Sequence, residues 1–148
     1  MKWLREINDN EADPSEALFE VPSLAPCPAT LALVDDDQAV RHALSFAFET
    51  AGFDVVTFAD AESAAKAPER RSWRCLVLDQ NLPGMSGLEL LARLRREGLA
   101  MPAVLITTHP SKDTVARARA AGVEIIEKPL LDDQLSRKVG SLVAERGS

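Results

Sequence analysis

Residues 75–87 carry the sequence Cys-Leu-Val-Leu-Asp-Gln-Asn-Leu-Pro-Gly-Met-Ser-Gly. A short apolar run that ends in turn residues is typical of a strand buried on both faces of a sheet. After the Pro-Gly turn, leucines at 88, 90, 91 and 94 recur at helical spacing, and arginines at 93, 95 and 96 lie on the opposite side. The stretch therefore predicts a buried strand, a tight turn and an amphipathic helix over residues 87–97.

The same alternation of apolar runs and helical segments continues along the chain from residue 31. Short buried strands separated by helices are typical of a parallel sheet covered on both faces. We therefore predict an α/β fold with a doubly wound sheet of five parallel strands and five helices. The predicted strands are 31–34, 55–58, 75–78, 103–106 and 124–126, and the predicted helices are 38–51, 60–67, 87–97, 112–121 and 131–145.

Length and composition describe one globular domain with an acidic segment in front of it. The chain has 148 residues, 46% of them hydrophobic and 27% charged, and a net charge of −6. A negative charge of this size argues against a general nucleic-acid binder, which would carry a basic face. We find no signal peptide and no apolar stretch long enough for a membrane span, so we expect a cytoplasmic protein without a membrane partner.

The excess negative charge is concentrated at the N-terminus. The first 30 residues hold two basic and six acidic residues together with four prolines. We therefore divide the chain into an acidic, proline-rich leader at 1–29, expected to be flexible, and a folded domain at 30–148. The alternative for the leader is a docking peptide that orders on a partner.

Polar side chains follow four of the five predicted strands. Asp35 and Asp36 follow the first, Asp79 the third, Thr107 the fourth and Lys128 the fifth. Because ligands of such sheets bind at the carboxyl ends of the strands, these residues form the candidate site. Like charges about 4 Å apart near a protein surface cost on the order of 4 kcal/mol, so three clustered carboxylates require a cation. Oxygen ligands indicate a hard ion, Mg²⁺ or Mn²⁺, and the set as a whole indicates phosphoryl transfer with Asp79 as nucleophile.

At these residues the chain resembles the two-component response-regulator receiver family, the CheY-like domains, and is closest in motif to the FixJ-type branch. The resemblance covers roughly residues 30–146 and implies a flavodoxin-like sheet with strand order 2-1-3-4-5. FixJ-type receivers usually continue into a DNA-binding domain, but from the length of this chain we expect a stand-alone phosphorelay protein without an effector domain. We also expect it not to be an enzyme beyond its own phosphorylation and dephosphorylation. The motifs that carry the resemblance are 34–37 (Val-Asp-Asp-Asp), 78–79 (Leu-Asp), 82–87 (Leu-Pro-Gly-Met-Ser-Gly), 106–107 (Ile-Thr) and 127–129 (Glu-Lys-Pro).

The resemblance also implies a role for each site residue. Asp79 is expected to be the phosphoacceptor, and Asp36 a direct Mg²⁺ ligand. Asp35 is expected to act mainly through metal-bound water, and the backbone carbonyl of Asn81 to be a further ligand.

Three more roles follow from the same resemblance. Thr107 is the expected switch hydroxyl, and Lys128 is expected to pair with the phosphoryl group. Ile125 occupies the position of the family's switch aromatic, and with no ring there the coupling between Thr107 and that position is expected to be muted.

The resemblance implies partners, and three alternatives for function stay open. A histidine kinase or histidine phosphotransferase is the expected donor of the phosphoryl group. A downstream target is expected to bind the face formed by the fourth helix, fifth strand and fifth helix, or the leader. Formation of a homodimer on phosphorylation is a further expectation. Two alternatives are a phosphorylation-gated and a phosphorylation-independent interaction module. The third is a haloacid-dehalogenase-like phosphatase that would use Asp35 as its nucleophile.

Overall fold

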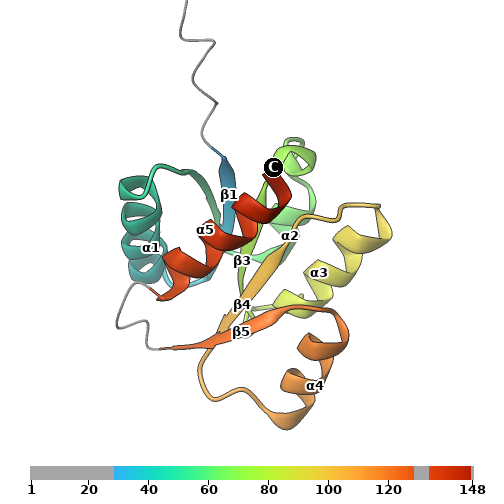
Figure 1. Ribbon diagram of the computed structural model, residues 1–148. Helices are drawn as coiled ribbons and strands as arrows, with labels where there is room; N and C mark the ends of the chain where they lie inside the picture. The colour runs from blue at the N-terminus through green and yellow to red at the C-terminus, as the bar shows by residue number, and fades with distance from the viewer. Residues whose placement is uncertain (1–28, 129–133, 148) are drawn as a thin grey trace, which may run out of the picture.

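The computed structural model describes residues 29–128 and 134–147 of the chain. They form a five-stranded parallel sheet in the order β2-β1-β3-β4-β5, with helices on both faces (Figure 1). The strands are β1 (Thr30–Val34), β2 (Asp54–Phe58), β3 (Cys75–Asp79), β4 (Ala103–Thr107) and β5 (Glu124–Glu127). The helices are α1 (Gln38–Thr50), α2 (Ala61–Ala65), the 3₁₀ turn η3 (Arg70–Ser72), α3 (Gly87–Arg96), α4 (Lys112–Ala120) and α5 (Gln134–Gly147).

The predicted fold class and strand order are confirmed, and the differences lie at the ends of elements. Asp79 and Thr107 are the last residues of β3 and β4 instead of following them, because parallel pairing with Ile106 and Glu127 continues to the end of each strand. The helix predicted over 60–67 is shorter, since Lys66 and Ala67 already form the tighter hydrogen bonds of a 3₁₀ turn.

Two parts of the prediction lie outside the described residues. Residues 1–28 contain nearly all of the predicted leader, so its flexibility and the domain boundary at residue 30 stay predictions. The predicted start of the last helix, 131–133, is also outside the described ranges.

Two apolar clusters, one on each face of the sheet, hold the layers together. One face is covered by α2, α3 and α4, whose side chains meet Leu76, Leu78 and Leu105 of the central strands. The other face is covered by α1 and α5, which place Phe48, Leu135 and Val139 over Val77 and Ile106, among others. Because the two central strands β3 and β4 are buried along their whole length, the residues at their carboxyl ends are held rigidly.

Side-chain caps fix where four helices begin. Asp37, Asp60, Ser86 and Ser111 each accept a hydrogen bond from a backbone N–H in the first turn of α1, α2, α3 and α4. At α3 the cap is reciprocal, because the Glu89 carboxylate accepts from the backbone N–H of Ser86. Each capped start follows the carboxyl end of a strand, so the caps also fix the loops around the candidate site.

A buried tryptophan lies shortly before β3 in the sequence. Trp73 is 2% exposed and packs against Phe58, with ring centroids 5.5 Å apart. Its indole nitrogen has no hydrogen-bond partner within the described part of the chain. The preceding segment, where no helix was predicted, forms η3, and Arg70 there donates to Glu97 at 2.9 Å.

Cys75 is the first residue of β3, and its side chain is fully buried, as its apolar neighbours predicted. Burial raises the pKa of this thiol to about 12. The group is therefore a small core side chain and not a nucleophile.

None of the helices in the described ranges combines the length and apolar character needed to cross a bilayer.

Candidate functional site

The residues predicted to form the site meet at one edge of the sheet. Asp35 and Asp36 directly follow β1, Asp79 ends β3, Thr107 ends β4 and Lys128 directly follows β5. All four strands run in the same direction, so their carboxyl ends lie side by side. The fold thus brings together residues that are up to 93 positions apart in the sequence.

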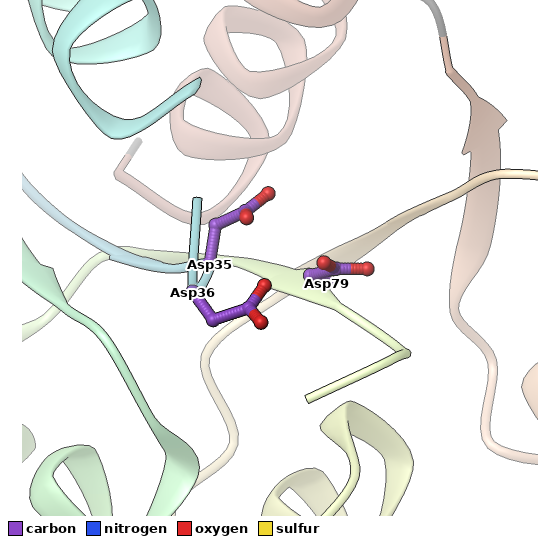
Figure 2. Close-up of side chains that lie close together, drawn as sticks. All are labelled: Asp35, Asp36 and Asp79. Carbon is purple, nitrogen blue, oxygen red and sulfur yellow. The ribbon is translucent and has the colours of Figure 1, made fainter. Parts of the chain in front are cut away.

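Three carboxylates form the centre of this edge. Asp35, Asp36 and Asp79 each offer an oxygen that lies within 4.8 Å of the others. Figure 2 shows them side by side, two on the loop after β1 and one at the end of β3. Asp36 is exposed, whereas Asp35 and Asp79 are buried.

Asp35 is the most enclosed of the three and is already bonded by protein groups. It is 0% exposed; its Oδ1 accepts from the Asp37 backbone N–H and its Oδ2 from Lys128 Nζ, both at 2.9 Å. The Arg41 guanidinium on α1 donates to the Asp35 carbonyl oxygen at 2.7 Å. Asp35 therefore anchors the loop, and Asp36 is the more accessible ligand of the two.

Asp79 is buried and only partly compensated. Its Oδ1 accepts from the Asn81 backbone N–H at 3.2 Å, and its Oδ2 accepts from Lys128 Nζ at 3.3 Å. Burial and the charge of Asp35 raise the pKa of Asp79, and the contacts with Asn81 and Lys128 oppose that rise. The ionised form of this carboxylate is thus in an unfavourable environment that a cation would relieve.

Lys128 bridges the two buried aspartates. Its ammonium group lies 2.9 Å from Asp35 and 3.3 Å from Asp79. Burial alone would lower the pKa of Lys128, but the hydrogen bonds and charges of the two carboxylates raise it above its usual value. The lysine is therefore a fixed positive charge beside Asp79 and not a proton donor.

Thr107 and Asn81 complete the site next to Asp79. The Thr107 hydroxyl is 1% exposed and accepts a hydrogen bond from the Asn81 side-chain amide at 3.3 Å. The Thr107 carbonyl accepts from the backbone N–H of Lys128 at 2.8 Å, so the ends of β4 and β5 are joined.

The loop between β3 and α3 is fixed by residues that sequence reasoning did not identify. The Gln80 side chain accepts from Leu88 N–H, and the Glu62 carboxylate accepts from Met85 N–H, both at 2.9 Å. Gln80 directly follows Asp79, so its adjacency was a usable signal. Glu62 lies on α2 at a separation of 23 residues, and no local pattern indicates that contact.

Two glycines let this loop come close to the site. A Cβ at Gly87 would lie 2.5 Å from the Asp79 carbonyl oxygen, and a Cβ at Gly84 would lie 2.6 Å from the Glu62 carboxylate. Gly84 also has a φ of +75°, which disfavours other residues. The turn between β3 and α3 is therefore shaped by contacts with Asp79 and with α2.

Ile125 lies near the site residues and carries no aromatic ring. It pairs with Leu105 in the β4–β5 register and is half-buried against the cluster under α2, α3 and α4. The muted coupling expected between Thr107 and position 125 stays a prediction.

The donor set fits a hard divalent cation. Three carboxylates and one lysine leave a charge of −2 at the centre of the site. Carboxylate and carbonyl oxygens are the ligands that Mg²⁺ prefers, and Mg²⁺ keeps waters when few protein ligands are present. The groups that could bind the cation directly are Asp36, Asp79 and the Asn81 carbonyl. Asp35 is more enclosed and would act on the cation indirectly.

The chain is similar in sequence to known proteins. The sequence profile described as "Response regulator receiver domain" matches residues 31–140. The chain is 34% identical over 114 residues to the transcriptional regulatory protein FixJ of Bradyrhizobium diazoefficiens, covering 76% of this chain and 56% of that protein. It is 31% identical over 121 residues to the probable transcriptional regulatory protein TcrX of Mycobacterium tuberculosis, covering 81% and 52%.

A solved structure agrees with these sequence matches. The crystal structure of FixJ-N superposes with a TM-score of 0.68 at 34% identity, covering 79% of this chain and 94% of that one. The chain spans about half the length of the curated relatives it matches.

Proposed function

The chain belongs to the response regulator receiver domain family, and we propose that it carries a two-component or phosphorelay signal by accepting a phosphoryl group on Asp79. The family consists of regulators rather than of enzymes in the usual sense. One observation carries the proposal: a nearly buried carboxylate ends β3 with a lysine 3.3 Å away and two more carboxylates within 4.8 Å. The expected donor is a phosphohistidine on a histidine kinase or histidine phosphotransferase.

The proposed transfer uses groups that are already in place. A carboxylate oxygen of Asp79 forms the new bond to phosphorus, and the bond from phosphorus to the donor's histidine nitrogen breaks, with its electron pair staying on the nitrogen. Lys128 neutralises charge on the phosphoryl oxygens, and the Thr107 hydroxyl donates a hydrogen bond to one of them. Attack by water on the phosphorus later releases inorganic phosphate and restores the Asp79 carboxylate.

A divalent cation, Mg²⁺ or Mn²⁺, would supply charge neutralisation between the carboxylates and the phosphoryl oxygens when bound. We assign Asp36, Asp79 and the Asn81 carbonyl as direct ligands. Asp35 is assigned an indirect role because it is 0% exposed and both of its carboxylate oxygens accept at 2.9 Å, closer than the contacts of 3.2 and 3.3 Å at Asp79.

The test is labelling of the purified chain with a small phosphodonor such as acetyl phosphate in the presence of Mg²⁺. Peptide mass spectrometry is expected to find one phosphoryl group on Asp79, and none in Asp79→Asn or Asp36→Ala. Asp37→Asn is the matched control, because Asp37 lies in the same loop but caps α1, a role that asparagine also fills. Stable incorporation into Asp79→Asn would overturn the assignment.

The same experiment tests the phosphatase alternative, which requires label on Asp35. That residue is 0% exposed and bonded on both oxygens, and the family match lends this alternative no support.

For the output we propose the surface of α4, β5 and α5, or the leader, as the place where a cytoplasmic target binds, with phosphorylation-dependent homodimerisation as a further outcome. What supports the first surface is its light packing: α4 buries only Thr114 and Ala118, and β5 is an edge strand. Deleting residues 1–28 separates the two surfaces, because loss of signalling with normal phosphorylation would assign the target to the leader. An Asp79→Asn chain that still signals would instead support a phosphorylation-independent module.

A further inference from the structure

Asn81 contacts both of the groups between which a phosphoryl group would lie. Its backbone N–H donates to Asp79 Oδ1 at 3.2 Å, and its side-chain amide donates to Thr107 Oγ1 at 3.3 Å. Asp79 ends β3 and Thr107 ends β4, so one loop residue connects the two strand ends. The expectation from sequence concerned only the carbonyl of Asn81, and its side chain has no role in the function proposed above.

The polarity of the contact with Thr107 is informative. A hydroxyl has one proton and two lone pairs, and a side-chain N–H₂ group can only donate. Thr107 therefore uses a lone pair toward Asn81 and keeps its proton for another acceptor. Among the described residues, no other side chain bonds this hydroxyl.

The surroundings leave this hydroxyl little freedom. Thr107 is 1% exposed, its carbonyl is held by Lys128 N–H, and its branched Cβ restricts rotation of the side chain. Position 125, where a ring could have influenced Thr107, holds a half-buried isoleucine. The Asn81 amide is thus the contact that can orient the Thr107 proton.

We infer that the Asn81 side chain is a positioning residue for Thr107. By donating to Oγ1 it directs the hydroxyl proton toward a phosphoryl oxygen on Asp79, with no covalent change of its own. The inference rests on the proposed function, because it concerns the phosphorylated form of the same site.

A double-mutant cycle tests whether Asn81 acts through Thr107. The full chain, Asn81→Ala, Thr107→Ala and the double variant are titrated with beryllofluoride, a phosphoryl mimic, at saturating Mg²⁺. We expect Asn81→Ala to weaken binding by roughly three- to tenfold, the effect of one hydrogen bond, but by less than about twofold when Thr107 is alanine. In a Thr107→Ser background, which restores the hydroxyl, the full effect of Asn81→Ala should return.

Each outcome decides between distinct conclusions. An equal loss in both backgrounds would show that Asn81 acts independently of Thr107, and no loss in either would remove its role; both results overturn the inference alone. A wild-type chain that binds no beryllofluoride overturns the proposed function and the inference with it. Thermal unfolding of every variant checks folding, and Asn81→Ser provides a second loss of the amide should Asn81→Ala be unstable.

Discussion

At the scale of single residues, the site shows how one residue type acquires two roles from its surroundings. Asp35 and Asp79 are both buried beside Lys128, but the donors to the two Asp35 oxygens lie at 2.9 Å, whereas those to Asp79 lie at 3.2 and 3.3 Å. The pKa of Asp79 is raised by burial and by the charge of Asp35. The incompletely compensated carboxylate is the one we assign as the nucleophile.

Asp79→Asn is expected to stabilise the chain in the absence of divalent cations. Because the folded pKa of Asp79 lies above its usual value of 3.8, the stability that its protonated form contributes is present below that value. It is lost as the pH rises through the folded pKa, so ionised Asp79 destabilises the fold at neutral pH. Asparagine never ionises, so the Tm should rise at pH 7, by roughly 2–4 °C for each 1 kcal/mol gained.

Differential scanning calorimetry at pH 7 in EDTA measures the change. Asp37→Asn again serves as control, since it removes an exposed carboxylate nearby. A lower Tm for Asp79→Asn would mean that the contacts of Asp79 with Lys128 and Asn81 outweigh its burial.

At the scale of elements, periodicity and turn residues predicted the five strands and the five α-helices of the described fold, but neither the 3₁₀ turn η3 nor where each element ends. The apolar runs identified β3 and β4, whereas the inclusion of Asp79 and Thr107 depends on pairing with neighbouring strands. The site residues could be predicted because each follows a strand directly. Contacts such as Glu62 with Met85 could not, since they depend on how α2 packs against a distant loop.

The side-chain cap of α2 should contribute to stability in a pH-dependent way. The backbone N–H of Ser63 donates to Asp60 and lowers the pKa of Asp60 below 3.8. Its contribution to stability is therefore present above pH of about 4 and lost as the pH falls through the folded pKa. Asp60→Ala should lower the free energy of unfolding by about 1 kcal/mol at neutral pH.

Urea unfolding at several pH values measures this contribution. The difference between the wild type and Asp60→Ala should shrink below pH of about 4, and Asp60→Asn should keep most of the cap without that titration. A difference that stays constant with pH would contradict the role of the charge.

Two glycines, one at the start of α3 and one within α5, should respond differently to substitution by alanine. At Gly87 a Cβ would meet the Asp79 carbonyl at 2.5 Å, whereas at Gly140 within α5 it meets nothing within 4 Å. Gly87→Ala should therefore cost about 1–3 kcal/mol through overpacking. Gly140→Ala should instead add about 0.5–1 kcal/mol, because alanine loses less backbone entropy in a helix.

Chemical denaturation of both variants tests this pair, with each acting as the other's control. Similar destabilisation by both would show that α5, and not only the start of α3, requires glycine.

At the scale of the whole molecule, negative charge is concentrated in two places, the N-terminal segment and the candidate site at the edge of the sheet. The chain has a net charge of −6, of which the first 30 residues account for four units. In the folded part three carboxylates lie together at one edge of the sheet, and a single lysine offsets them. The stability of the fold should therefore depend on divalent cations.

Mg²⁺ is expected to raise the Tm of the wild-type chain. A ligand that binds only the folded state adds about 2.7 kcal/mol when its concentration is one hundred times Kd. Asp36→Ala removes the most accessible carboxylate and should reduce the gain strongly, whereas Asp37→Asn should keep it. Calorimetry at several Mg²⁺ concentrations measures the gain, and an equal shift in Asp36→Ala would place the cation elsewhere.

The buried Trp73 gives the core an intrinsic fluorophore that contacts a direct neighbour of the site. Its ring packs against Phe58 with centroids 5.5 Å apart, and the Phe58 carbonyl accepts from the backbone N–H of Asp35 at 3.1 Å. The chain has a second tryptophan, Trp3, so the emission of Trp73 should report the packing of the core in a Trp3→Phe background. Folding and unfolding rates can therefore be recorded on that unlabelled chain with Asp79 unmodified or modified, and the difference between the two states gives the stability that the modification confers.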